Sequence, residues 1–590
     1  MFAGSNLGRA KAVTSSQPAP IGGWNVRDSL AQMKPTEAVY MENWWPTTVD
    51  VQVRKGYVNW ATGLPGTVDT IMAWNGPAGT KKLFAVTSTG SLYDVTTQGA
   101  VGAALITGLS NGQWQYVAFS TPGGSFLLAC NGLDNMLRFN GTNWVTVLGS
   151  ATGATISTLT GNGTTSTVTT ATPHGLLTGN TITVTGASVA GFNVGPVAIT
   201  RTGANTFTYP STGTPSATGA SYTVGEVITG INPASVWNIN IFKSRIWLVQ
   251  KNSLSAWYLP SLAIQGAATE FPMGSLFPAG GQLSAMGTWT IDVGVGIDDN
   301  AAFFSSEGEI LVYKGTDPSS ASTFSLVGLF KQGNPIGLRC QIKYLGDVFV
   351  ITDLGVAPMS ESILTAQVTL KSQLTDKILP AMAAAVAQSK TTFGWQMVAY
   401  PAQNMLVINV PFSGGNYQFA MNTITGAFTK FTGWQARCWE VQGASLYWGG
   451  TGIVALAWNS NSDAGSPITA DTLQAFNSFG ASTQTKKPTM LRPIFYSDGT
   501  PAVSIGVNFD YDQTSVPTGT LNFTPPTGMT WGSMTWGSMT WGGSLVVNKS
   551  WQFASGLGYS MGVRVKVSNN SSELRWASTD WVFERGGVLS

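Results

Sequence analysis

Short apolar runs separated by turn residues recur along most of the chain. In residues 70–96, TIMAWNGPAGTKKLFAVTSTGSLYDVT, an apolar run is followed by a turn, a second apolar run, a glycine and a third run. Runs of this length, bounded by Gly, Asn and Pro, are typical of strands joined by tight turns. Six or seven such units occur, at residues 70–96, 114–147, 236–260, 286–315, 340–359, 394–431 and 439–458.

This repetition of small strand–turn–strand units predicts an all-β protein with the blades of a β-propeller. We attribute the irregular spacing of the units to insertions. The Trp-Asp and Gly-His signatures of WD40 blades are absent, and glycine doublets occur at no fixed place in the units, which argues against kelch blades. An array of ordinary β-sandwiches is the alternative interpretation.

Two segments depart from the blade pattern. Residues 150–227 are rich in Thr, Gly and Ser and alternate Thr with Val or Ile, a period of two that predicts an inserted small β domain. Residues 359–392 contain the Ala- and Leu-rich stretch SESILTAQVTLKSQLTDKILPAMAAAVAQSK, which has no Gly and predicts a helical excursion. Pro380 is expected at a break in this helix or in its first turn.

The expected organisation therefore has seven parts, of which the last is a C-terminal β domain that contains a tryptophan repeat. They are an N-terminal arm with the first strands (1–66), blades (67–149), the inserted domain (150–227), further blades (228–358), the helical excursion (359–392), final blades (393–466) and the C-terminal β domain (467–590).

Charge and cysteine content narrow the possible environment and partners. Charged residues make up 10% of the 590 residues and the net charge is +2, so no general electrostatic attraction draws the chain to nucleic acid or membranes. The three cysteines are scattered, which predicts buried thiols rather than disulfides or a metal site. No apolar signal core or membrane-spanning run is visible, so we expect a soluble protein that folds in a reducing cytoplasm.

Motifs that would carry catalysis are scarce. His174 is the one histidine, and its Pro-His-Gly setting predicts a turn with a structural role. Ser560 lies in a GxSxG match, but no histidine follows it as a hydrolase would require. Asp298 and Asp299 are expected in a turn rather than in a metal site or an acid pair. We therefore predict no catalytic, cofactor-binding or metal-ligating residues, and a protein that is not an enzyme.

A pentapeptide repeat, MTWGSMTWGSMTWGG, spans residues 529–543 and places Trp531, Trp536 and Trp541 five residues apart. This spacing turns a helix by about 500° and alternates faces in a strand, so neither gives a single Trp stripe. A bulge or turn at each glycine would realign the rings. Two interpretations remain: a surface loop that packs its own tryptophans, or an aromatic ladder that faces a neighbouring chain.

A basic cluster, Lys486, Lys487 and Arg492, lies in TKKPTMLRP. The favoured interpretation is a solvated strand edge whose charges block pairing with other chains. The alternative is a weak contact with phosphate.

The N-terminal segment, APIGGWNVRDSLAQMKPTEAVYMENWWPTTVDVQVRKGY, resembles the opening of tail nozzle proteins (tail tubular protein B type) of short-tailed bacteriophages. Further matches occur at residues 241–260, 327–340 and 575–589, and the Trp repeat is similar to repeats of this group. The inserted domain resembles an accessory module of varied phage structural proteins. The matching N-terminal residues are Gly22, Gly23, Asn25, Arg27, Asp28, Met33, Pro35, Ala38, Asn43, Trp44, Arg54, Gly56 and Tyr57.

The resemblance implies a structural virion protein that forms a homohexameric ring, the distal nozzle of the tail, after assembly in the host cytoplasm. Such a ring is the conduit for DNA ejection, contacts a tail adaptor protein and tail fibres or spikes, and meets the host cell envelope indirectly. In this setting the three repeat tryptophans become candidate subunit-interface residues. The rival hypothesis is a receptor- or glycan-binding tail propeller, possibly a depolymerase, whose exposed tryptophans stack on sugars.

Overall fold

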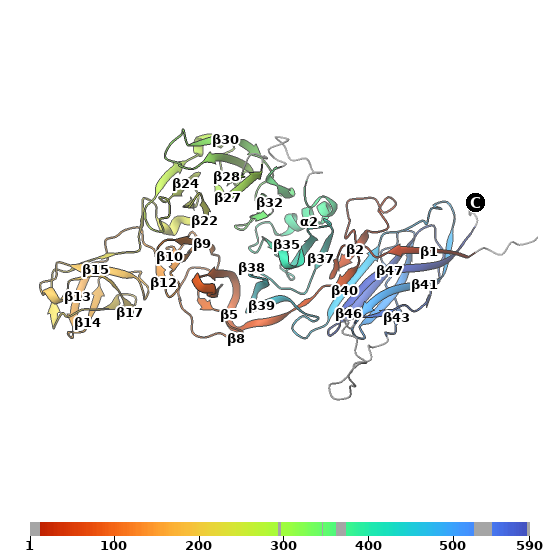
Figure 1. Cartoon of the computed structure of the whole chain (residues 1–590), viewed down its shortest axis with the longest axis horizontal. Coiled ribbons are helices and arrows are strands. Elements are labelled where there is room, and N and C mark those ends of the chain that lie inside the picture. The colour runs from red at the N-terminus through yellow and green to blue at the C-terminus, as the bar shows by residue number, and fades with distance from the viewer. Residues whose placement is uncertain (1–11, 293–296, 345, 361–372, 524–544, 587–590) are drawn as a thin grey trace, which may run out of the picture. The chain divides into compact units, whose positions relative to one another are not determined.

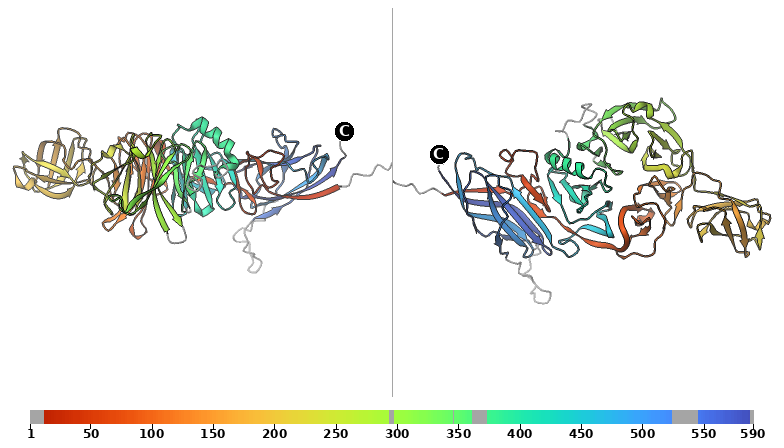
Figure 2. Two further views of the ribbon diagram at one scale, coloured as in Figure 1. Left: turned by 90° about the horizontal axis from the view of Figure 1, so that it is seen from above. Right: turned by 180° about the vertical axis from the view of Figure 1, so that it is seen from behind.

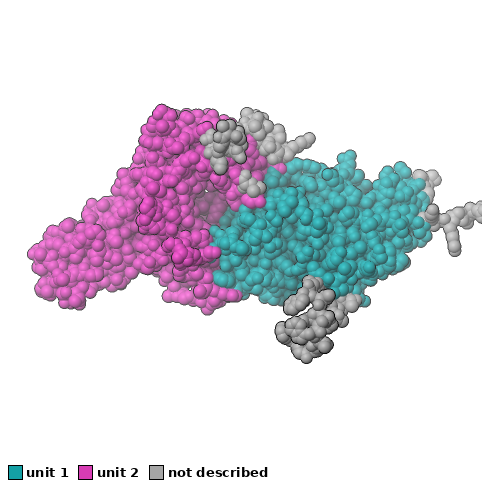
Figure 3. All heavy atoms as spheres, viewed as in Figure 1, with its two compact units in different colours: residues 1–60, 374–448, 455–590 teal, residues 61–373, 449–454 magenta. Residues whose placement is uncertain are grey.

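The computed structural model describes residues 12–292, 297–344, 346–360, 373–523 and 545–586 (Figure 1). The chain forms two compact units, coloured separately in Figure 3. Unit 1 comprises Met1–Trp60, Leu374–Trp448 and Ala455–Ser590, and unit 2 comprises Ala61–Gln373 and Gly449–Val454. The fold is all-β with propeller blades, an inserted small β domain, a helical excursion and a C-terminal β domain, so the fold-class prediction is confirmed.

Successive antiparallel sheets of three or four strands form the blades of unit 2. Each blade follows the chain order, because tight turns join strands that are neighbours in sequence. The strands are β9 (Gln115–Thr121), β10 (Gly124–Cys130), β11 (Leu137–Phe139) and β12 (Trp144–Thr146); β22 (Val236–Phe242), β23 (Arg245–Gln250), β24 (Ser255–Tyr258) and β26 (Thr269–Pro272); β27 (Leu283–Asp292), β28 (Ile297–Ser305), β29 (Glu309–Gly315) and β30 (Phe324–Lys331); and β31 (Gln341–Tyr344), β32 (Asp347–Thr352) and β33 (Gly355–Pro358).

Buried apolar clusters join each of these blades to the next. One cluster combines Leu128 of β10 with Ile246 of β23, a second combines Trp247 of β23 with Phe303 of β28, and a third combines Phe304 of β28 with Val350 of β32. Alternate residues of a strand point to opposite faces, so each blade contributes one face to each neighbouring cluster. This face-to-face packing of consecutive sheets is the propeller arrangement.

Further strands of unit 2 include the end of β5 (Gly56–Asn75), along which the chain passes from unit 1. It pairs with β6 (Lys81–Thr87), which pairs with β7 (Leu92–Asp94). Short pairs involve β8 (Gly99–Ala100), and β21 (Ile228–Thr229) with β25 (Gly266–Ala267). Short 3-10 turns are η1 (Pro77–Gly79), η2 (Ala190–Phe192), η3 (Pro233–Ser235) and η4 (Gly274–Leu276).

The Thr-rich insertion forms two sheets of its own around an apolar core. Its alternating pattern is visible in β14, where Ser166, Val168 and Thr170 are buried and the residues between them are not. Phe207 and Tyr222 pack edge to face in the core. The strands are β13 (Ile156–Gly161), β14 (Thr165–Thr170), β17 (Thr200–Arg201), β18 (Thr206–Pro210) and β19 (Ser216–Ala217) in one sheet, and β15 (Thr181–Thr185), β16 (Val194–Ala198) and β20 (Ser221–Val224) in the other.

Unit 1 contains one more blade-like sheet, which continues into a sheet of the C-terminal β domain. Its strand order is β34 (Gln396–Tyr400), β35 (Met405–Val410), β36 (Tyr417–Asn422), β37 (Phe428–Phe431), β2 (Ala38–Glu42), β40 (Ile468–Gln474), β46 (Met561–Asn569), β42 (Ala502–Phe509) and β43 (Gly519–Leu521). Also in unit 1 are β38 (Cys438–Gln442), most of β39 (Ser445–Ser460) and the turn η7 (Pro401–Gln403).

A second sheet completes the C-terminal β domain, and it includes strands from the N-terminal part of the chain. The strand β47 (Leu574–Arg585) pairs on one side with β41 (Lys486–Ser497) and on the other with β1 (Ala12–Pro18) and β4 (Val51–Val53). Figure 2 shows the red strand β1 beside the blue C-terminal strands. The remaining strands are β3 (Trp44–Pro46), β44 (Val546–Asn548) and β45 (Gln552–Phe553).

The helical excursion contains η6 (Asp376–Ile378) and α2 (Leu379–Ser389). Pro380 lies in the first turn of α2, which is one of the two positions expected for it. Backbone N–H groups in the first turn make no hydrogen bond within the helix, so the N–H that proline lacks is not needed there. The buried residues Met382, Ala385 and Val386 hold one face of α2 against unit 1. Among the described residues, no helix combines the length and apolar character that crossing a membrane requires.

Candidate functional site

Arg54, one of the residues that carry the N-terminal resemblance, is the centre of a buried polar junction in unit 1. Its side chain is 1% exposed, and its two terminal nitrogens contact both carboxylate oxygens of Asp463 at 2.9 and 2.6 Å. Its Nε donates to Asn43 Oδ1 at 2.8 Å, and Nη2 donates to the carbonyl of Thr432. The guanidinium also lies 4.8 Å from the ring centre of Trp434. Every charged group here therefore has a partner, as burial requires.

Two further motif residues near Arg54 in the sequence are buried, and one of them, Asn43, contacts Arg54 directly. Asn43 has φ 58°, a left-handed conformation that Asn tolerates better than most residues. Its amide donates to Thr432 Oγ1 at 2.9 Å and to the carbonyl of Thr469 at 2.8 Å. The neighbouring Trp44 is fully buried and packs edge-on against Trp576 of β47, with ring centres 6.2 Å apart. The motif thus ties the first strands to the C-terminal domain.

Gly56 shows why this motif contains glycine. A Cβ at this position would lie 1.9 Å from the carbonyl oxygen of Ser462, because the two backbones approach closely where Tyr57 N donates to that oxygen. Gly23 is equally restricted: its φ is +75°, and a Cβ would lie 2.6 Å from the Phe428 carbonyl oxygen. Both glycines permit backbone approaches that no side chain would allow.

We expect Gly56→Ala to lower the free energy of unfolding of unit 1 by about 1–3 kcal/mol or more, because the added methyl overlaps a backbone atom. Thermal unfolding followed by calorimetry measures this. Gly102→Ala is the matched control, because a Cβ there meets nothing within 4 Å. Equal melting of both variants and the parent chain would contradict the close approach.

A second polar cluster surrounds Asn25, another motif residue. Its amide donates to Asp28 Oδ2 at 2.8 Å and to Glu37 Oε2 at 2.9 Å, and Lys377 reaches Glu37 at 3.0 Å. Arg27 pairs with Asp28 at 2.7 Å. The hydrogen bonds from Arg27 and then Asn25 lower the pKa of Asp28 to about 2, which outweighs the opposing effect of burial.

This depressed pKa has a consequence for acid stability. The Asp28 carboxylate stabilises the folded state fully above its ordinary pKa of 3.8, and this contribution is lost as the pH falls through about 2. In Asp28→Asn we therefore expect the melting temperature to fall less steeply than in the parent chain between about pH 4 and pH 2. Parallel melting curves over that range would show that the carboxylate contributes nothing.

The structure corrects the interpretation of Lys486, Lys487 and Arg492 as a strand edge. The strand β41 is internal: at Lys486 it pairs with Arg585 of β47 on one side and with Gly558 on the other. Lys486 is buried, and its Nζ donates to the carbonyls of Ala481, Gln484 and Tyr559 at 2.6, 2.9 and 2.6 Å. Burial lowers the pKa of this lysine. Since the ammonium has three internal acceptors, it is a structural group.

The other two basic residues point outward. Lys487 is exposed, whereas Arg492 pairs with Asp580 of β47 at 2.7 Å and lies 4.8 Å from the ring centre of Trp551. The three side chains therefore do not converge on one basic surface. This arrangement gives no support to the alternative of a phosphate contact, because Lys486 faces inward and Arg492 already has a carboxylate partner.

The residues that the sequence offered as candidates for catalysis contact other groups of the protein. His174 is buried; its Nδ1 accepts from Leu176 N at 3.0 Å, and burial lowers its pKa. Asp299 lies in β28 rather than in the expected turn, where it contacts Lys243 at 3.2 Å. The prediction of a turn was wrong because β27 and β28 extend further than the polar residues suggested. The three cysteines are buried and free, as predicted.

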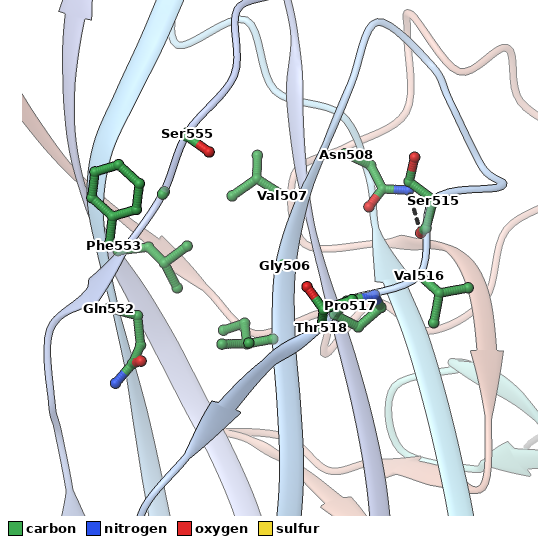
Figure 4. A pocket seen from close by; sticks show the side chains of 14 residues that line it. Gly506, Val507, Asn508, Ser515, Val516, Pro517, Thr518, Gln552, Phe553 and Ser555 are labelled. Atoms are coloured by element: carbon green, nitrogen blue, oxygen red, sulfur yellow. Dashed lines mark hydrogen bonds between the residues drawn. The ribbon is translucent and has the colours of Figure 1, made fainter.

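The side-chain clusters and one pocket of the described residues bear on whether the chain holds a metal site or an acid–base centre. No group of three or more His, Cys, Asp or Glu side chains there is placed to hold a metal. Figure 4 shows a pocket of about 290 Å³ between β42, β43 and β45, where Asn508 donates to the carbonyl of Ser515 at 3.1 Å. Its described lining contains no ionisable side chain, so it offers no general acid or base. The repeat tryptophans Trp531, Trp536 and Trp541 lie outside the described residues.

An exposed apolar strand is the feature of unit 2 that sequence reasoning did not single out. The strand β30 is the outermost of its blade, and Leu326, Val327 and Leu329 are 44%, 49% and 41% exposed. Figure 1 shows it along the outer side of that blade. The open side of an edge strand usually carries charged residues that prevent association with another chain. Val327 and Leu329 also fall within residues 327–340, a segment of the resemblance.

No protein-family model and no curated protein matches the chain. Solved structures with some likeness include BBS1N in complex with ARL6DN (9% identity, 69% of this chain and 98% of that chain, TM-score 0.32) and YCF48 bound to D1 peptide (10%, 70% and 94%, 0.23). A third is the β-propeller domain of Myceliophteria thermophila Cps50 (Swd1) (10%, 68% and 98%, 0.26). At these TM-scores the likenesses carry no inference about function.

Proposed function

We propose that the chain is a structural subunit of the tail of a short-tailed bacteriophage, and that six copies form the ring-shaped distal nozzle through which the genome leaves. The observation that carries the proposal is the exposed apolar edge of β30, which overlaps a segment that resembles nozzle proteins. Large apolar side chains left exposed on an edge strand favour association with another chain. We assign that edge to the neighbouring subunit of the ring, in one heterologous contact repeated around the axis.

Two other features support a structural role. The N-terminal motif residues form buried junctions that stabilise unit 1, and their charged groups are bonded to protein partners rather than presented to a substrate. The net charge of +2 suits a conduit, because a strongly basic lumen would hold DNA through its phosphates. In this proposal the ring contacts a tail adaptor protein and tail fibres or spikes, and it acts within the virion.

The mass of the assembly formed with the adaptor protein tests the proposal. A ring predicts six copies of the 62.1 kDa chain. A chain that stays monomeric beside its adaptor and releases reducing ends from host polysaccharide would instead be the rival, a depolymerising tail propeller.

A further inference from the structure

A groove of about 400 Å³ lies on the outer face of the sheet formed by β1, β47 and β41 in unit 1. Its volume falls within the range of about 300–1,000 Å³ that is usual for small-molecule sites. Charged and aromatic side chains share its lining, whereas the described lining of the pocket in Figure 4 contains no charged side chain. The lining residues are Thr14, Ser15, Ser16, Arg492, Trp551, Asp580, Trp581 and Val582.

Strand register places three side chains of this groove in one row, and a ring contact adds a fourth. Ser16 of β1 is opposite Asp580 of β47, and Asp580 is opposite Arg492 of β41. Directly opposed residues of antiparallel strands project from the same face. Arg492 donates to Asp580 Oδ2 from Nε at 3.0 Å and from Nη2 at 2.7 Å, and Trp551 continues the row beyond Arg492. Trp551 remains 40% exposed, which is unusual for so large an apolar side chain.

The charge of the row limits the class of ligand. Arg492 is already neutralised by Asp580, so a phosphate or sulfate would find no unpaired cation. Burial raises the pKa of Asp580, but the hydrogen bonds from Arg492 and Ser16, with the charge of Arg492, together hold it below its ordinary value, so the pair stays ionised near neutral pH. The row therefore offers hydrogen-bond donors and acceptors together with an apolar ring, and no net charge.

We propose that this groove binds a neutral saccharide. A pyranose ring has an apolar C–H face that packs on an indole and a rim of hydroxyls that both donate and accept, and these match Trp551 and the Ser16–Asp580–Arg492 row. Binding rather than cleavage is inferred, because glycoside hydrolysis uses a pair of carboxyl groups and the groove lining contains one. The inference is independent of the ring assembly proposed above.

Saturation-transfer NMR with the full chain tests this site. The probes are the methyl glycosides of glucose, galactose, mannose and N-acetylglucosamine, at millimolar concentration. We expect transfer to at least one probe, and a weakening of its affinity by about tenfold or more in Trp551→Ala, the scale of losing an aromatic anchor. Phe553→Ala is the matched control: Phe553 is 82% exposed two residues away and does not line the groove.

Arg492→Lys provides a second variant, which keeps the charge but loses the two-pronged contact with Asp580 and should also weaken binding. Unchanged melting temperatures would show that both variants are folded. The proposal is overturned if no probe receives transfer, if transfer persists unchanged in Trp551→Ala and Arg492→Lys, or if inorganic phosphate displaces the bound glycoside.

Discussion

Replacing Arg54 by methionine is expected to lower the free energy of unfolding of unit 1 by about 3–5 kcal/mol, the cost of removing one partner from a buried ion pair. The change leaves the Asp463 carboxylate largely buried without its guanidinium, and it removes donors from Asn43 and the Thr432 carbonyl. Calorimetry of the full chain measures the effect as a lower melting temperature.

Lys55→Met is the matched control for this experiment. Lys55 is adjacent in sequence and pairs with Glu573 at 2.9 Å, but both side chains are partly exposed. Such a pair contributes about 0–1 kcal/mol, so the control should melt close to the parent chain. If Arg54→Met and Lys55→Met melted alike, the junction would not stabilise unit 1 as its geometry indicates.

Changing Leu326, Val327 and Leu329 together to lysine is expected to abolish ring assembly while the single chain stays folded. These side chains are already exposed on β30, so lysine costs little in the monomer, but three charges on the edge oppose pairing with another subunit. Native mass spectrometry with the adaptor protein should then detect monomers only.

The control carries three lysines at apolar positions elsewhere that are equally or more exposed: Val49, Leu262 and Ile424. It has the same added charge, so it separates the position of the change from its effect on net charge. If the β30 variant still assembled, β30 would not be part of the subunit interface. If both variants lost assembly, the added charge rather than its position on β30 would be the cause, and the assignment of β30 would fail.

Much of the fold could be predicted because its signals are local. Blade strands alternate with Gly- and Asn-containing turns, and the inserted domain alternates Thr with Val, as the burial of Val168 between less buried threonines shows. The pairing of β1 and β4 with β47 could not be predicted. More than five hundred residues separate these strands along the chain, and no local pattern specifies a partner at that distance.

The sequence also marked some residues of the candidate sites but not the residues that they contact. Arg54, Asn43 and Gly56 were marked by the N-terminal resemblance, but their partners Asp463 and Thr432 lie in segments that carry no motif. Lys486 looked like a surface charge because sequence shows an ammonium and not the three carbonyls that surround it. Trp551 gave no signal, since its place beside Arg492 depends on the register of β41.

The central claim is that this chain forms a ring, and native mass spectrometry of the chain mixed with its tail adaptor protein tests it most directly. The account predicts a complex that contains six copies of the 62.1 kDa chain, and electron micrographs of that complex with six-fold symmetry. A chain that remains monomeric at every adaptor concentration would contradict it.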